Sequence, residues 1–140
     1  MITIMVEASP IKNVKDYKDK SLLIVDDNNP FRERLARAME KKGFVVTQAE
    51  SVKKGIDSLQ ITKPAFAVID LRLNDGNGLE VVKEIQSLNN NSRIIMLTGY
   101  GNIPTAVAAI KHGAIDYLAK PADADDVEKA LLADPKSKAQ

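Results

Sequence analysis

The chain has 140 residues and a mass of 15.3 kDa, the size of one ordinary domain with a single hydrophobic core. Hydrophobic residues make up 44% and charged residues 28%, which excludes wholesale disorder, a coiled coil and a collagen-like chain. The formal net charge of +1 gives no sign of the strongly basic balance of nucleic-acid binders, and the absence of cysteine excludes disulfides, thiolate zinc sites and cysteine nucleophiles.

The apolar runs, such as residues 22–25 and 94–97, are much shorter than the roughly 18 residues that a membrane span requires. The first ten residues have no basic segment, and their short apolar stretch contains Glu7, which argues against a secretory signal. These features predict a cytoplasmic protein.

Residues 1–20 mix Lys and Asp without a sustained period, which predicts a flexible leader. From Ser21 onward, short β-branched runs alternate with longer amphipathic stretches, which indicates repeated βα units. The predicted strands are 22–25, 44–47, 65–69, 94–97 and 115–118. The predicted helices are 30–42, 52–62, 79–88, 104–112 and 124–132. The predicted fold class is α/β, a flavodoxin-like (CheY-like) doubly wound sheet of five parallel strands with five helices.

The first helix has the clearest ends. Asn29 before Pro30 predicts an N-cap, and Gly43 after a basic pair predicts the end of the helix. The apolar positions of this segment recur at helical spacing. The charged positions are expected to face water: Arg32, Glu33, Arg37 and Glu40.

Polar residues end the predicted strands. The first strand ends at Asp26 and Asp27, the third at Asp70, the fourth at Thr98 and the fifth at Lys120. Ligands of open α/β sheets bind beyond the carboxyl ends of the strands. With the strand order 2-1-3-4-5, the three aspartates converge. Their mutual repulsion favours a hard divalent cation such as Mg²⁺ among them.

Magnesium shares its coordination with phosphate oxygens, so the pattern predicts a phosphoryl group at this edge. Thr98 can donate to one phosphoryl oxygen, Lys120 can neutralise another, and a carboxylate can itself accept the group. The residues alone leave open which aspartate is the acceptor. They also leave open a plain structural role for each group, such as a turn and helix cap at Asp26 and Asp27.

At these residues the sequence resembles the receiver domain of two-component response regulators, over residues 21–133. The segments that carry the resemblance are LLIVDD, AVIDLRLNDGNGLE, IIMLTGYGNI and GAIDYLAKPAD. The last third of the domain is most similar to the RegA/PrrA/ActR type of redox-linked regulators, in which the receiver controls a short DNA-binding helix-turn-helix domain.

The resemblance implies roles for the acidic residues. Asp70 would accept a phosphoryl group from the phosphohistidine of a histidine kinase. The Mg²⁺ ion would be held by Asp26, Asp27, Asp70 and the backbone carbonyl of Arg72.

The resemblance also implies which residues respond to phosphorylation. Thr98, Gly99 and Lys120 would surround the phosphoryl group, and Thr98 and Tyr117 would form the switch pair. Pro121 would follow a cis peptide bond, although base rates alone favour a trans bond.

The implied partners are a sensor histidine kinase and a second copy of the chain. Dimerisation on phosphorylation would use the fourth helix, fifth strand and fifth helix, within residues 104–132. DNA would be bound only through a helix-turn-helix domain absent from this sequence, and residues 134–140 would be a polar tail or the start of a linker.

Two other classes remain open as alternatives. A small Mg²⁺-dependent phosphohydrolase also uses an aspartyl phosphate, but the haloacid-dehalogenase type has a second acid two residues after the nucleophile, where this chain has Arg72. A flavodoxin-like cofactor binder would need a phosphate-cradling loop after the first strand, and that loop is acidic here.

Four further residues complete the predictions. Asn74 stands where many receivers have proline, in a loop over 74–78 that is expected to be more mobile. Arg72 and Tyr100 are expected to influence water access to the phosphorylated site and therefore its lifetime. His112, the single histidine, is expected to be structural, at the end of a helix.

Overall fold

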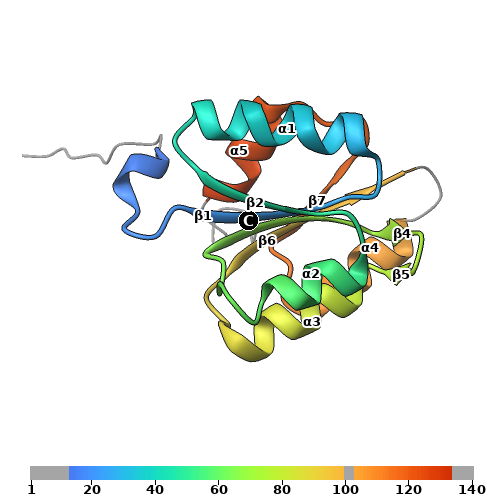
Figure 1. The fold of residues 1–140 in the computed structure, drawn as a ribbon. Helices are drawn as coiled ribbons and strands as arrows, with labels where there is room; N and C mark the ends of the chain where they lie inside the picture. The colour runs from blue at the N-terminus through green and yellow to red at the C-terminus, as the bar shows by residue number, and fades with distance from the viewer. Residues whose placement is uncertain (1–12, 100–102, 134–140) are drawn as a thin grey trace, which may run out of the picture.

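The computed structural model describes residues 13–99 and 103–133. A sheet of five parallel strands lies between two layers of helices (Figure 1). The strands are β1 (Ser21–Val25), β2 (Val45–Ala49), β3 (Phe66–Asp70), β6 (Arg93–Thr98) and β7 (Asp116–Ala119). Their order, β2-β1-β3-β6-β7, is the predicted 2-1-3-4-5 arrangement, because β6 and β7 are the fourth and fifth strands of this sheet.

The helices cover the two faces of the sheet unequally. They are α1 (Asn29–Lys41), α2 (Val52–Ser58), α3 (Leu79–Leu88), α4 (Ile103–Lys111) and α5 (Ala124–Leu132). One face packs against α1 and α5, and the other packs against α2, α3 and α4 (Figure 1). Among the described residues, no helix has the length and apolar character needed to cross a bilayer.

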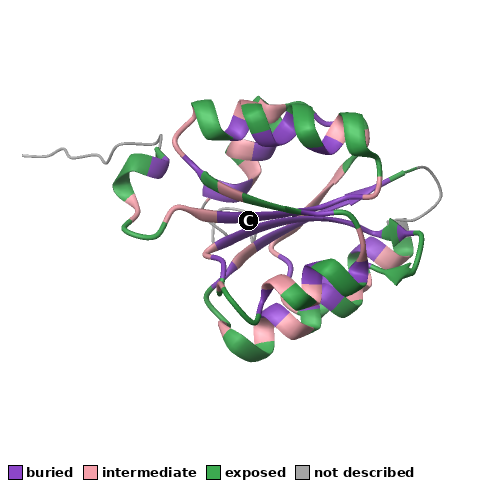
Figure 2. Cartoon of the chain, viewed as in Figure 1, coloured by how far each residue is buried: buried purple, intermediate pink, exposed green. Residues whose placement is uncertain are grey.

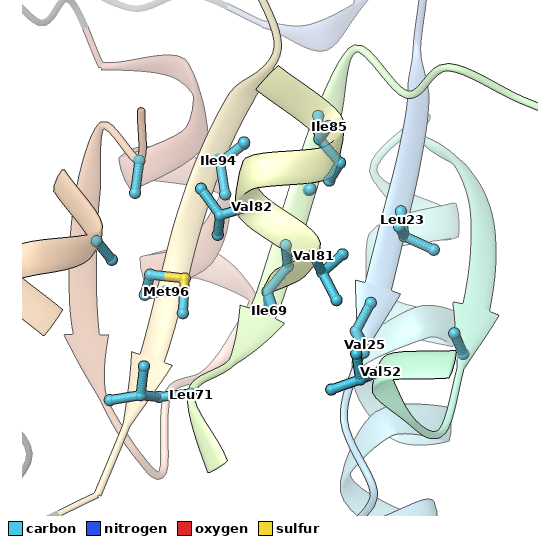
Figure 3. Close-up of a cluster of buried hydrophobic side chains, with 14 of the residues drawn as sticks. Leu23, Val25, Val52, Ile69, Leu71, Val81, Val82, Ile85, Ile94 and Met96 are labelled. Atoms are coloured by element: carbon cyan, nitrogen blue, oxygen red, sulfur yellow. The ribbon is translucent and has the colours of Figure 1, made fainter. Parts of the chain in front are cut away.

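Strand alternation supplies both hydrophobic cores. Leu22 and Ile24 of β1 face α1 and α5, whereas Leu23 and Val25 face α2 and α3. Figure 3 shows the second cluster, in which side chains of α3 lie over β3 and β6. Burial of each such side chain contributes about 1.5–3 kcal/mol. The central strands β1, β3 and β6 are almost entirely buried, because helices cover both of their faces, whereas the edge strand β2 is largely exposed (Figure 2).

Most predicted ends lie within one or two residues of the observed ones, and two differences have a visible cause. The second helix ends at Ser58 instead of residue 62, because turn hydrogen bonds such as Ile61 N to Ser58 O replace the helical ladder there. The N-cap of α1 is Asn28 instead of Asn29: the Asn28 Oδ1 atom accepts a hydrogen bond from the Phe31 amide at 3.1 Å.

Arg32 corrects the predicted polarity of α1. Its side chain was expected in water, but the residue is only 7% exposed, on the buried side of the helix with Leu35 and Met39. Glu33, Arg37 and Glu40 are exposed as predicted.

Residues 13–20 differ from the flexible leader predicted over residues 1–20, of which residues 1–12 lie outside the described part. Val14–Asp16 form a 3-10 helix, and Val14 is fully buried in the cluster that also contains Phe44. A Cβ atom at Gly43, where φ is +112°, would lie 3.0 Å from Val14 Cγ1. The ordered part of the chain therefore begins before Ser21.

The loop after β3 contains a short antiparallel hairpin that the sequence analysis did not predict. Its strands are β4 (Arg72–Leu73) and β5 (Gly76–Asn77). At the tip, the Asp75 carboxylate accepts hydrogen bonds from the backbone amides of Val52 at 2.8 Å and Lys53 at 3.0 Å. The hairpin is therefore tied to the first turn of α2.

Candidate functional site: an acidic cluster at the carboxyl edge of the sheet

Asp26 directly follows β1 and is held at its amide and carboxylate. Its amide donates to Ala49 O of β2 at 3.1 Å, and its Oδ1 accepts from the Asn28 amide at 2.8 Å. Its Oδ2 accepts from Lys120 Nζ at 2.9 Å. The residue is 0% exposed, so this carboxylate is held in place inside the protein.

Two more carboxylates meet Asp26 at this edge. One carboxylate oxygen from each of Asp26, Asp27 and Asp70 lies within 4.8 Å of the other two. The pairing of β1 with β3 brings Asp70 beside Asp26, as the strand order predicted. Asp27 is partly exposed and Asp70 is 6% exposed, so the cluster opens toward solvent on one side.

Lys120 lies over the acids. Its Nζ is 2.9 Å from Asp26 Oδ2 and 3.4 Å from Asp70 Oδ2. It also lies 4.9 Å from the centre of the Phe31 ring, in a cation–π arrangement. The Lys120 amide donates to Thr98 O at 2.8 Å, and the Lys120–Pro121 peptide bond is cis, as the resemblance implied.

The pKa values reflect this crowding. Burial, together with the negative charge of Asp26, raises the pKa of Asp70 from its ordinary 3.8 to about 6, although Lys120 opposes the rise. For Lys120, burial lowers the pKa, but the bonds and charges of Asp26 and Asp70 outweigh burial, so that the net pKa is raised. The ammonium group therefore remains charged at neutral pH.

Thr98 and Gly99 lie at the end of the neighbouring strand. Thr98 is 1% exposed, and its hydroxyl donates to Gly99 O at 3.1 Å. A Cβ atom at Gly99 would have no atom of the described residues within 4 Å. The structure thus places a buried hydroxyl at the acidic edge of the sheet, next to a glycine that the other described residues do not crowd.

Tyr117 and Arg72 are more peripheral. Tyr117 is partly buried on β7, where it packs against the core. Its register partner on β6 is Met96, whereas the residue opposite Thr98 is Ala119. The Arg72 side chain is exposed, while its backbone amide donates to the Asp70 carboxylate. Tyr100 lies outside the described residues.

The acidic cluster fits a hard divalent cation. It offers three carboxylate oxygens close together, two of them from buried residues, and oxygen is the ligand atom that Mg²⁺ and Ca²⁺ prefer. Within the described part of the chain, Lys120 is the cationic side chain that pairs with these carboxylates. A bound metal ion would relieve the repulsion that remains among the three carboxylates.

The comparisons with known proteins agree with this geometry. The model of the response regulator receiver domain matches residues 22–132. The chain belongs to this family. It is 60% identical over 117 residues to the acid tolerance regulatory protein ActR of Rhizobium meliloti, and 61% identical over 115 residues to the photosynthetic apparatus regulatory protein RegA of Rhodobacter capsulatus.

These alignments cover 84% and 82% of this chain but only 60% and 62% of the two relatives. The receiver thus spans less than two thirds of the curated regulators that it matches.

Among solved structures, a response regulator from Burkholderia pseudomallei is 37% identical with a TM-score of 0.79. The match covers 86% of this receiver and 71% of that chain, which contains a phosphorylated aspartic acid, a calcium ion and citrate. FixJ-N is 32% identical, with a TM-score of 0.71, and the match covers 81% of the receiver and 91% of that chain.

One buried side chain at this edge was not predicted from the sequence. Arg32 of α1 is buried, and its guanidinium donates to Asp26 O at 2.8 Å. Its charge alone placed it on the water side in the prediction. A signal was available in the helical spacing, because Arg32 precedes Leu35 by three residues and Met39 by seven and therefore lies on the same face of α1. The backbone carbonyl that it contacts is defined only by the fold.

Proposed function

We propose that this receiver is a phosphorylation-controlled signalling switch and that Asp70 accepts a phosphoryl group from the phosphohistidine of a sensor histidine kinase. The observation that carries the proposal is the Asp70 carboxylate, which lies beside two other carboxylates and Lys120 at an edge of the sheet that opens to solvent. One Asp70 oxygen would attack phosphorus, the phosphorus–nitrogen bond would break, and the imidazole would leave with the electron pair and take up a proton. The product is an acyl phosphate.

The surroundings of Asp26 support the choice of Asp70 over it. Asp26 is 0% exposed, and its two oxygens already accept bonds from the Asn28 amide and Lys120. A bulky phosphoryl donor cannot reach such a group. Between Asp70 and Asp27, the family resemblance favours Asp70.

We also propose that Mg²⁺ binds to Asp26, Asp27, Asp70 and the Arg72 carbonyl. The cation would neutralise charge on the incoming phosphoryl group. The clustering of the three carboxylates supports this assignment, and the calcium ion in the related Burkholderia structure is consistent with a divalent cation at such a site.

The residues around Asp70 suggest how phosphorylation changes the protein. Lys120 would exchange part of its contact with Asp70 for a phosphoryl oxygen. The Thr98 hydroxyl would turn from Gly99 O toward the phosphoryl group to donate to another oxygen, and Tyr117 would turn inward behind it. The neutral, small Gly99 leaves room for this movement.

The output of the switch is proposed from the family. Phosphorylation would favour a dimer through α4, β7 and α5, in the cytoplasm. In a longer protein, a helix-turn-helix domain after the receiver would bind DNA and regulate transcription. Equal masses by light scattering with and without beryllofluoride, a phosphoryl mimic, would contradict the dimer.

The direct test is incubation with acetyl phosphate and Mg²⁺, followed by intact-mass spectrometry. The wild-type protein should gain one phosphoryl group, which D70N should not acquire and which EDTA should prevent. D57N, which changes an exposed aspartate of α2, is the matched control and should be labelled like the wild type. Labelling of D70N would refute Asp70 as the acceptor, and multiple turnover of an organic phosphate would favour a phosphohydrolase instead.

A further inference from the structure

Arg32 has an unusual set of partners for a buried cation. Its Nε donates to Gln48 Oε1 at 2.9 Å, and its Nη1 donates to Asn29 Oδ1 at 2.7 Å and to Asp26 O at 2.8 Å. All three acceptors are neutral oxygens. The carboxylate within 4 Å among the described residues is that of Glu33, at 3.9 Å and half exposed. Arg32 is therefore held by hydrogen bonds to neutral oxygens more than by an ion pair.

The three acceptors belong to three different parts of the acidic edge. Gln48 is on β2, Asn29 opens α1, and Asp26 follows β1. A guanidinium is planar and presents its donors in a rigid fork, so it can join these parts only in one arrangement. Arg32 thereby connects the β1–α1 loop to the edge strand and to the helix.

This connection acts on the backbone carbonyl of Asp26, whereas the strand partner binds its amide. The Asp26 amide is bound by Ala49 O, and its carbonyl is bound by Arg32. With both backbone groups held, the direction of the carboxylate depends on Arg32 even though the guanidinium does not touch the carboxylate. The next residue, Asp27, inherits its position from the same peptide unit.

We propose that Arg32 is a positioning residue for the cation site, which fixes the β1–α1 loop so that the Asp26 and Asp27 carboxylates converge with that of Asp70. This inference rests on the function proposed above. It assigns to Arg32 no contact with the cation or with the phosphoryl group.

Charge and position predict effects of opposite sign, which makes the proposal testable. A positive charge beside a cation site repels the cation, so if Arg32 acted only through its charge, R32Q would bind Mg²⁺ more tightly. If Arg32 acts by positioning, R32Q binds Mg²⁺ more weakly. R32K keeps the charge but cannot reach three acceptors in a fork, so it too should bind more weakly.

The experiment measures Mg²⁺ affinity by isothermal titration calorimetry for the wild type, R32Q, R32K and Q48A. Loss of an outer partner of a metal ligand typically costs about 10–100-fold in affinity, so about tenfold weaker binding is expected for R32Q and R32K. Q48A removes one acceptor and leaves the charge in place, so a smaller loss in the same direction is expected.

The matched control is R93Q. Arg93 is also a partly buried arginine that donates to backbone carbonyls, those of Leu131 and Ala133, but it lies at the opposite end of the sheet. R93Q should keep the wild-type Mg²⁺ affinity. Circular dichroism at the titration temperature verifies that every variant is folded.

A second readout needs no metal. The Asn28 amide donates to Asp26 Oδ1 at 2.8 Å, so its hydrogen exchange reports on the order of the loop. In metal-free R32Q and R32K, exchange at Asn28 should accelerate more than exchange at the amides of β6. R93Q should leave the exchange rate of Asn28 unchanged.

The outcomes separate the two proposals. Wild-type Mg²⁺ affinity and wild-type Asn28 exchange in R32Q would overturn the role of Arg32 and leave the proposed function intact. Tighter Mg²⁺ binding by R32Q, or an equal loss in R93Q, would also overturn it, since these results indicate a charge effect or general destabilisation. A wild-type protein without Mg²⁺ affinity would overturn the proposed function itself.

Discussion

At the amino edge of the sheet, apolar and aromatic side chains close the core, whereas at the carboxyl edge three carboxylates and a lysine face one another. At the first edge, the Phe66 ring contacts Tyr17 and Phe44 edge to face, with centroids 5.1 and 5.2 Å apart. Val14 is buried in the same cluster. Both edges belong to the same strands, so the difference lies in what each strand carries at its two ends.

The amino edge stabilises the fold, whereas the carboxyl edge carries the reactive groups. Aromatic pairs and buried methyl groups stabilise the amino edge. At the carboxyl edge, the raised pKa of Asp70 shows that its ionised form is disfavoured in the folded protein. The core at one edge therefore supports a charged site at the other that costs stability when it holds no cation.

Phe66→Ala should have the largest effect. Phe66 is fully buried and in contact with two other rings, so its truncation should lower the free energy of unfolding by about 3–5 kcal/mol. Chemical denaturation with urea measures the change. A loss below about 1 kcal/mol would show that the amino edge is not the stabilising end.

Val14→Ala tests whether residues 13–20 belong to the domain. Removal of two methyl groups from a fully buried side chain should cost about 2 kcal/mol in the same urea experiment. Ile61→Ala is the control, because Ile61 is 89% exposed and its truncation should cost little. Equal effects of the two substitutions would indicate that residues 13–20 do not contribute to the stability of the domain.

Asp70→Asn should raise the free energy of unfolding, whereas the two preceding substitutions should lower it. In EDTA at pH 7.5, D70N should be about 1–2 kcal/mol more stable than the wild type, because the raised pKa, which already includes the attraction of Lys120, represents roughly 3 kcal/mol, and the cost of burying the replacement amide offsets part of it. Urea denaturation measures this difference.

The pH dependence of that difference follows from the pKa of Asp70. The folded state binds the Asp70 proton more tightly than the unfolded state, so this group lowers stability as pH rises from about 4 to about 6. The advantage of D70N should therefore shrink as pH falls through this window. Mg²⁺ should stabilise the wild type more than D70N. A D70N protein less stable than the wild type in EDTA would contradict the view that the acidic edge is costly.

Asp75→Ala should have the smallest effect. The amides of Lys53 and Val52 lower the pKa of Asp75, so its stabilising contribution is present above pH 4 and is lost as pH falls through the lowered pKa. D75A should melt slightly below the wild type at pH 7, and the two melting temperatures should converge toward pH 3. Asp57→Ala, on the helix whose first amides Asp75 binds, controls for loss of a surface charge. A constant difference across this pH range would contradict the role of the carboxylate.

Much of the fold followed from local patterns. The β-branched runs and amphipathic stretches predicted all five strands of the main sheet and all five helices, two of them, α3 and α5, with their observed ends. These features are legible because periodicity reports which face of an element is buried. The hairpin over Arg72–Asn77 was not predicted, since its two-residue strands are too short to show a period.

The acids of the candidate site were also predicted, because polar residues at the ends of apolar strands are conspicuous in any α/β sequence. Burial of Arg32 was not predicted: its charge was taken to place it in water, although helical spacing puts it on the same face as Leu35 and Met39, and its hydrogen-bond acceptors on β2 and after β1 are defined only by the fold. Val14 was missed for a different reason. A short polar segment contains no period that would reveal it, and the strands and helices of its cluster lie far along the chain.

By itself, the sequence determined the order of the elements, the strand ends that carry Asp26, Asp70, Thr98 and Lys120, and the chemistry available there. Only the tertiary structure decided that Asp26 is fully buried while Asp70 keeps a small exposed area, and that Lys120 bridges the two. The physical reason is that composition and period are local properties, whereas burial and the distance between charges depend on segments that meet only when the chain folds.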